Sequence, residues 1–214
     1  MSTQTKLNLG CGPVQPEAWD NIDYSLRARL AGQLNWLDSL LVKLGILSPT
    51  EFGPQVKNIN LVKPLPYKTN SVEAIYAGEL WEHLLPTDAL SLTKECFRVL
   101  EKGASLRVCV PDGQRFWERY LEIYQEEASK PTSEQKPDRL SRHTKMFFDD
   151  ICTKRSWLGS FGHFHKWQYD EIQLCQLFRE AGFTEPARKT FHNSQIEDIS
   201  EVERSDFLII EATK

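Results

Sequence analysis

The sequence predicts an α/β fold built on a mostly parallel sheet, and three observations support this prediction. A short apolar run, Lys6 to Leu9, ends directly on glycines, as a buried strand does when it enters a tight loop. Strand-like segments then alternate with segments of helical periodicity. Near residue 200, two strand-like segments follow one another without a helix, which favours an antiparallel pair at one edge of the sheet.

Composition is that of an ordinary globular protein of one domain. The chain has 214 residues, of which 40% are hydrophobic and 26% are charged, and no low-complexity linker divides it. Because we find no signal-like segment and no apolar run long enough for a bilayer, we expect a cytoplasmic protein with no membrane partner. The net charge of −4 gives no broad basic surface, so we expect no nucleic-acid partner. Five cysteines without a CxxC pair indicate free thiols.

The first candidate ligand site joins the glycine loop to an acidic residue. Gly10 and Gly12 let the backbone approach a ligand, but Gln15 stands where a dinucleotide fingerprint needs its third glycine. Ile22 belongs to a very short second strand, and Asp23 at its end can accept hydrogen bonds from two ribose hydroxyls. Alternatively, Asp23 is a turn or N-cap residue. The connection is far shorter than the usual span of about 20 residues, so the first crossover helix is truncated or absent.

Leucines recur at helical spacing from Leu26 to Leu44 and predict a helix that packs in the core or covers the ligand site. The segment Gln55 to Leu61 predicts a weak third strand before a proline-containing loop.

A better strand, Ser71 to Ala77, runs straight into the sequence GELWEHLL. This junction places Glu79, Glu82 and His83 just past the carboxyl end of a central strand, where open α/β sheets bind their ligands. His83 is a candidate general base because imidazole titrates near neutral pH; the alternative is a hydrogen-bonded structural histidine.

The next unit is a helix capped by Thr87 and a strongly apolar strand from Ser105 to Val110. Asp112 follows the strand and is expected to cap an aromatic-rich helix, the alternative being contact with substrate.

The remaining elements are one helix and two strands. Asp170 and Gln173 resemble a capping box at the start of a helix, and Gly182 stops that helix. The strands are predicted over Thr184 to His192 and Asp206 to Ala212.

Between the aromatic-rich helix after Asp112 and the helix at Asp170 lies a polar segment, Glu126 to Lys145, which predicts a mobile excursion that acts as a lid. An aromatic-rich run follows, in which His163 and His165 would share one face if extended. No third ligand stands at a recognisable spacing, so we expect a substrate pocket or a packed loop rather than a metal site.

Five segments together resemble the class I S-adenosylmethionine-dependent methyltransferases, especially their type 11 branch: LNLGCG, NIDYS, LPYKTNSVEAIYAGELWEHL, KECFRVLEKGASLRVCVPD and REAGF. The resemblance implies a Rossmann-like, doubly wound, seven-stranded, mostly parallel sheet with an antiparallel last strand. It implies one domain over residues 1–214, with a helical insertion at about 26–47 and a lid-like insertion at about 126–167. The implied cofactor is S-adenosyl-L-methionine.

The resemblance also implies roles for individual residues. The glycine loop would pass beneath the methionine part of the cofactor, Asp23 would hold the ribose, Asn60 and Leu61 would line the adenine, and the end of the fourth strand would meet the methionine carboxylate or the sulfonium. The cofactor-binding residues expected in this way are Leu9, Gly10, Cys11, Gly12, Asp23, Asn60, Leu61, Gly78, Glu79 and Leu80.

The function expected from the resemblance is methyl transfer to a small-molecule acceptor that the sequence does not identify. If the acceptor is a hydroxyl, His83, His163 and His165 are the candidate catalytic bases. Three alternatives stay open: a non-catalytic methyltransferase-like binding or regulatory protein, a nicotinamide oxidoreductase, and a metal-dependent hydrolase that uses His163 and His165.

Overall fold

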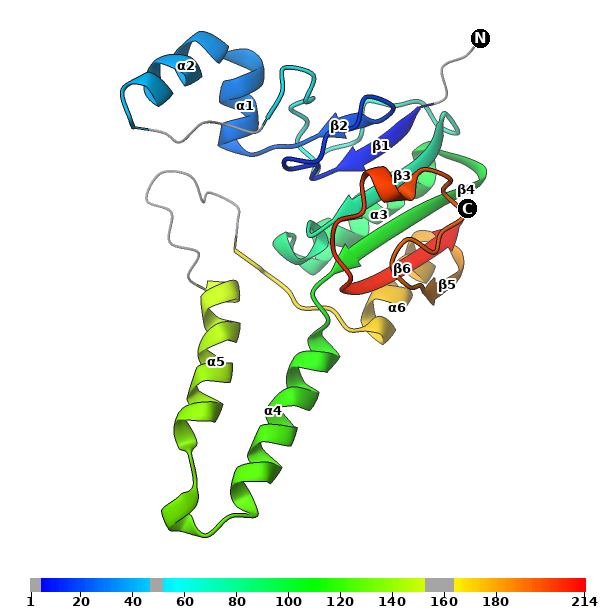
Figure 1. Cartoon of the computed structure of the whole chain (residues 1–214). Coiled ribbons are helices and arrows are strands. Elements are labelled where there is room, and N and C mark those ends of the chain that lie inside the picture. The colour runs from blue at the N-terminus through cyan, green and yellow to red at the C-terminus, as the bar shows by residue number, and fades with distance from the viewer. Residues whose placement is uncertain (1–4, 47–51, 153–163) are drawn as a thin grey trace.

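A computed structural model describes residues 5–46, 52–152 and 164–214, and its centre is one sheet in the order β2-β1-β3-β4-β6-β5 (Figure 1). The strands are β1 Lys6–Leu9, β2 Asp20–Ile22, β3 Val72–Gly78, β4 Leu100–Val110, β5 Thr184–Arg188 and β6 Leu208–Thr213. The first four strands pair in parallel, and β6 is antiparallel to both β4 and β5. This confirms the α/β, Rossmann-like, mostly parallel sheet with an antiparallel last strand.

The described residues form six strands rather than the seven that we expected. The predicted third strand, Gln55 to Leu61, is reduced to a single bridge between Lys57 and Ile22 at the edge of the sheet. Lys57 donates its N–H to the carbonyl of Asn21 at 2.8 Å, and the chain then turns away, with Lys63 N–H bonded to the carbonyl of Asn60. The pairing stops there because a turn replaces the extended backbone.

Six α-helices and three short 3-10 turns accompany the strands in the described ranges. The helices are α1 Leu26–Gln33, α2 Asn35–Lys43, α3 Pro86–Val99, α4 Gly113–Ala128, α5 Pro137–Cys152 and α6 Glu171–Ala181, and the turns are η1 Trp81–His83, η2 Thr132–Glu134 and η3 Ile199–Glu201. No helix within these ranges is both long enough and apolar enough to cross a bilayer.

Two local predictions about helices were wrong, and the excursion over residues 126–145 contains helices that were not expected. The predicted helix from Leu26 to Leu44 is broken in two at Leu34, which has a non-helical backbone. Helix α3 is capped by Leu85 and begins at Pro86, so Thr87 lies inside the first turn; proline fits the first helical position because it lacks an N–H. The polar excursion predicted over residues 126–145 is largely a helical hairpin of α4 and α5, which extends away from the sheet (Figure 1).

Alternate residues of the central strands point to opposite faces of the sheet, and different parts of the chain cover the two faces. Ile75 of β3 belongs to the large core that α3 and α6 complete, through residues such as Leu92 and Phe178. Its neighbour Tyr76 belongs to a smaller cluster on the other face. That cluster is covered by the segment 189–207, which contributes Ile196, Ile199 and Val202 and carries only the short η3.

A buried arginine fixes this covering segment to the sheet. Arg107 of β4 is 0% exposed, and each of its five N–H donors is used. Two donors bind both carboxylate oxygens of Glu203 at 2.7 and 3.0 Å, and one binds Glu211 at 3.0 Å. The other two bind the carbonyls of Thr190 and Asn193 at 2.9 Å. Hydrogen bonds and charges from the two glutamates outweigh the effect of burial and raise the pKa of Arg107.

Candidate functional site

The connection between β1 and β2 has no helix, as its short length predicted. Two buried asparagines hold it instead. Asn8 of β1 donates to the carbonyl of Val14 at 2.8 Å and to the side-chain oxygen of Asn21 at 3.0 Å. Asn21 of β2 donates to the carbonyls of Pro16 and Trp19 at 2.9 and 3.0 Å. These side chains hold three carbonyls of the loop, at Val14, Pro16 and Trp19, so the loop is bound to β1 and β2 although no helix supports it.

The glycine loop lies at the carboxyl edge of β1 and folds over the end of β2. Gly10 and Cys11 both donate their N–H groups to the carbonyl of Ile22, at 2.8 and 3.1 Å. Gly10 and Gly12 have φ angles of +67° and +52°, a conformation that residues with a Cβ rarely adopt. The loop conformation therefore favours glycine at both positions.

Asp23 lies directly against this loop. One of its carboxylate oxygens accepts the Gly12 N–H at 3.3 Å, and the other accepts the Ser25 N–H at 2.7 Å. Ser25, and not Asp23, caps α1, because its hydroxyl accepts the N–H of Ala28. A carboxylate has about four lone-pair sites, so Asp23 keeps acceptor capacity for a ligand beside the glycine loop.

A residue that the sequence reasoning missed completes the loop from the other side. Arg204 comes from the segment that covers the second face, and its guanidinium binds three backbone carbonyls: Cys11 at 2.7 Å, and Gly10 and Gly78 at 3.1 Å. A Cβ at Gly12 would lie 2.9 Å from Arg204 Nη1. Arg204 therefore ties the ends of β1 and β3 together and places a positive charge beside the glycine loop.

The end of β3 supplies the remaining central part of the site. Glu79 has a φ of +56°, which is uncommon for a residue with a side chain and clusters at functional sites. Its carboxylate accepts the Ser205 hydroxyl at 2.5 Å. The Leu80 side chain lies against Gly10, where an added Cβ would be 3.3 Å from Leu80 Cβ. Gly78, through Arg204, and Leu80 thus adjoin the glycine loop, and the contact of the β3 end with the cofactor stays a prediction.

Asn60, Leu61 and Asp112 were also candidate site residues, and each of them has contacts within the fold. Leu61 is buried in the main core, next to Asn60, whose side chain accepts the Val62 N–H. Asp112 caps α4 by accepting the Arg115 N–H at 3.3 Å and pairs with Arg188 at 2.9 Å. Asp112 therefore has the capping role that the sequence predicted.

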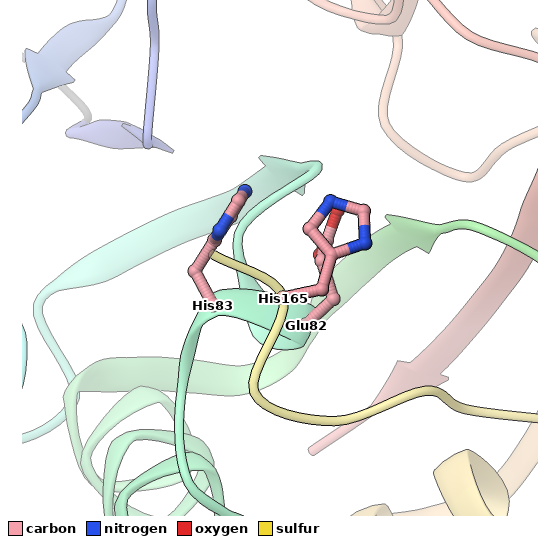
Figure 2. Close-up of side chains that lie close together, drawn as sticks. All are labelled: Glu82, His83 and His165. Carbon is pink, nitrogen blue, oxygen red and sulfur yellow. The ribbon is translucent and has the colours of Figure 1, made fainter. Parts of the chain in front are cut away.

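A cluster of two histidines and a glutamate lies beside the β3 end. Glu82 and His83 come from η1, and His165 comes from the segment that returns to the sheet before α6 (Figure 2). One possible ligand atom from each of the three lies within 4.8 Å of the others, and the rings of His83 and His165 meet edge-to-face with centroids 4.8 Å apart. His163 lies outside the described residues. Glu82 is the third possible ligand in this cluster. The spacing of the histidines in the sequence did not indicate it.

Burial raises the pKa of the thiol of Cys11, the cysteine in the glycine loop. Cys11 is 0% exposed, and burial, with a smaller effect from the charge of Asp23, raises the pKa of its thiol to about 12. At pH 8 a thiol with this pKa is about 0.01% thiolate, against about a quarter for an ordinary cysteine.

We therefore expect iodoacetamide to modify Cys11 at least about 1,000-fold more slowly in the native protein at pH 8 than in denaturant, because only the thiolate reacts. Mass spectrometry of the peptide that contains Cys11 measures the rate, and the denatured chain is the control. Equal rates in the two states would contradict the buried position of this thiol.

Several solved structures have a fold similar to that of this chain. An S-adenosylmethionine-dependent methyltransferase from Methanosarcina mazei is 16% identical over 100% of this chain and 93% of its own, with a TM-score of 0.52. Another from Archaeoglobus fulgidus is 11% identical over 99% of this chain and 86% of its own, with a TM-score of 0.50. The methyltransferase SibL is 12% identical with a TM-score of 0.51, and this chain spans about half (50%) of its length.

No protein-family model matches the chain, and no curated protein matches its sequence. At identities this low, likeness in structure establishes the fold. The chain has the α/β fold found in S-adenosylmethionine-dependent methyltransferases. The assignment to the type 11 branch stays a prediction from the sequence.

Proposed function

We propose that the protein transfers a methyl group from S-adenosyl-L-methionine to a small-molecule acceptor. The observation that carries this proposal is the contact between Asp23 and the glycine loop at the carboxyl edge of β1 and β2. A carboxylate with spare acceptor capacity next to a glycine-containing loop suits the ribose of a nucleoside cofactor. The fold of the solved methyltransferases supports the choice of this cofactor over others.

The roles expected for the remaining residues follow from their places around the loop. Leu9, Gly10, Cys11 and Gly12 would form the floor under the methionine part, and the guanidinium of Arg204 would hold that floor in shape. Gly78, Glu79 and Leu80 would border the sulfonium. Methyl transfer from a sulfonium is an in-line displacement, so an enzyme can accelerate it largely by aligning donor and acceptor in a dry site.

Calorimetric titration with S-adenosylhomocysteine tests the cofactor assignment. We expect one molecule to bind per chain with a Kd near the micromolar range, about −8 kcal/mol, because hydrogen bonds from Gly12 and Ser25 orient the Asp23 carboxylate beside the glycine loop. NADH in a parallel titration is the control and is expected not to bind. Saturable binding of NADH with none of S-adenosylhomocysteine would instead support the nicotinamide alternative.

A second candidate function is that of a methyltransferase-like protein that binds the cofactor without turnover. The absence of a helix between β1 and β2 favours it. The two candidates differ in product formation. A methyltransferase moves label from methyl-labelled S-adenosylmethionine into small molecules of a cell extract, whereas a binding protein retains the label on the cofactor.

A further inference from the structure

We propose that Glu82, His83 and His165 form a binding site for a divalent transition-metal ion, of which Zn²⁺ is the best match. The three residues offer one carboxylate oxygen and two imidazole nitrogens within 4.8 Å of one another (Figure 2). Two histidines and one glutamate are a recurrent ligand set of catalytic zinc sites. Imidazole favours zinc and its transition-metal neighbours, whereas Mg²⁺ prefers oxygen ligands and water.

The hydrogen bond of His83 prepares its ring for this role. Its Nδ1 lies 3.2 Å from the carbonyl oxygen of Phe164. A carbonyl oxygen only accepts, so Nδ1 must carry the proton in this contact, and the lone pair of the neutral ring is then on Nε2. Metal-binding histidines typically donate their second N–H to a carbonyl or carboxylate in this way, which fixes the tautomer and the ring orientation.

His165 is fixed although it is far from Glu82 in the sequence. The two residues that follow it, Lys166 and Trp167, both donate their N–H groups to the carbonyl of Glu82, at 2.6 and 3.1 Å. Further along the same segment, the carbonyl of Tyr169 accepts the N–H of Gly113 at 2.8 Å. The segment that carries His165 is therefore attached to η1 at one end and to α4 at the other, so the third ligand does not depend on a free loop.

Electrostatics also favours a cation here. Glu82 is 1% exposed, and a carboxylate this deeply buried is stabilised by positive charge, which a metal ion or a protonated imidazole supplies. Ligand atoms around a tetrahedral zinc ion stand about 3.4 Å apart. Closing the present triad onto an ion calls for shifts of about 1 Å or slightly more, which small rotations of the two half-buried rings provide.

Three protein ligands leave at least one coordination position for water or for an oxygen or nitrogen atom of the acceptor. The site adjoins Leu80, which contacts Gly10 of the glycine loop. A nitrogen that binds an ion cannot also act as a general base, so the assignment gives His83 and His165 a ligand role in place of the catalytic base role expected from the sequence. Binding of the ion itself does not depend on the proposed methyl transfer.

Titration of the EDTA-treated full chain with Zn²⁺, without any nucleoside, tests the site. We expect one tightly bound Zn²⁺ per chain, weak binding of Mg²⁺, and a visible absorption band when Co²⁺ is added. The variants His165→Gln and His83→Gln should each lower Zn²⁺ affinity at least about 100-fold, because removal of an outer-shell partner alone typically costs 10–100-fold.

The variant His143→Gln is the matched control, because His143 stacks on Phe116 in the helical hairpin, and it should bind Zn²⁺ like the unmodified protein. Glu82→Gln adds a test of the buried carboxylate, and circular dichroism checks that each variant is folded. Absence of stoichiometric Zn²⁺ binding, equal affinity for Mg²⁺, or unchanged affinity in both His83→Gln and His165→Gln would overturn the proposal. Titration with S-adenosylhomocysteine in EDTA measures the cofactor site separately, so either site can fail alone.

Discussion

Replacing Asp23 with alanine is expected to lower the affinity for S-adenosylhomocysteine at least about 100-fold. A hydrogen bond to a charged group contributes about 1.5–3 kcal/mol, and the carboxylate would accept two from the ribose hydroxyls. The substitution also removes the acceptor of the Gly12 N–H and of the Ser25 N–H, so the glycine loop loses its side-chain contact with Asp23 but keeps the backbone bonds of Gly10 and Cys11 to Ile22. Calorimetric titration of the variant measures the loss.

Asp20→Asn is the matched control for this experiment. Asp20 begins the same strand, β2, but its carboxylate binds Lys57 and Tyr67 away from the glycine loop. We expect it to keep nearly full affinity for S-adenosylhomocysteine. If Asp23→Ala binds as tightly as the unmodified protein while melting at the same temperature, Asp23 has no role in the cofactor site.

Replacing Arg107 with alanine should lower the free energy of unfolding by about 3–5 kcal/mol, the usual cost of removing one partner from a buried ion pair. Glu203 and Glu211 have side chains that are 0% and 3% exposed, and both would stay buried near a site without its positive charge. The carbonyls of Thr190 and Asn193 would each lose one donor as well. Urea unfolding monitored by circular dichroism measures this change.

Arg119→Ala is the comparison for the arginine network, because Arg119 forms its ion pair with Glu122 on the exposed surface of α4. Exposed pairs contribute little, so a change within about 0.5 kcal/mol is expected. A loss below about 1 kcal/mol for Arg107→Ala would mean that the covering segment is held mainly by its apolar residues.

Features governed by near neighbours in the chain were predictable from the sequence. Asp170 caps α6 by accepting the N–H of Gln173 at 2.8 Å, and Gly182 ends the helix in a left-handed conformation, both as expected. The short link from β1 to β2 was also predictable, because the distance from Gly12 to Asp23 leaves too little chain for a full crossover helix.

Features that join distant parts of the chain were not predictable. Arg204 binds carbonyls almost two hundred positions away, and nothing in its local sequence indicates a partner. The grouping of Glu82 with His165 depends in the same way on how the returning segment pairs with η1. Periodicity in a single sequence reports local structure, whereas these contacts are set by tertiary packing.

Residues 208–213 form β6, the last of the six strands to leave the ribosome, yet β6 pairs with β4 and β5 on either side. During synthesis, β4 therefore keeps an unpaired edge until after β5 has been made. At about 5–20 residues per second, the ribosome needs roughly 5–20 s to supply the chain between the end of β4 at Val110 and the start of β6 at Leu208. For that interval the nascent chain exposes an apolar strand edge of the kind that promotes aggregation and that chaperones cover.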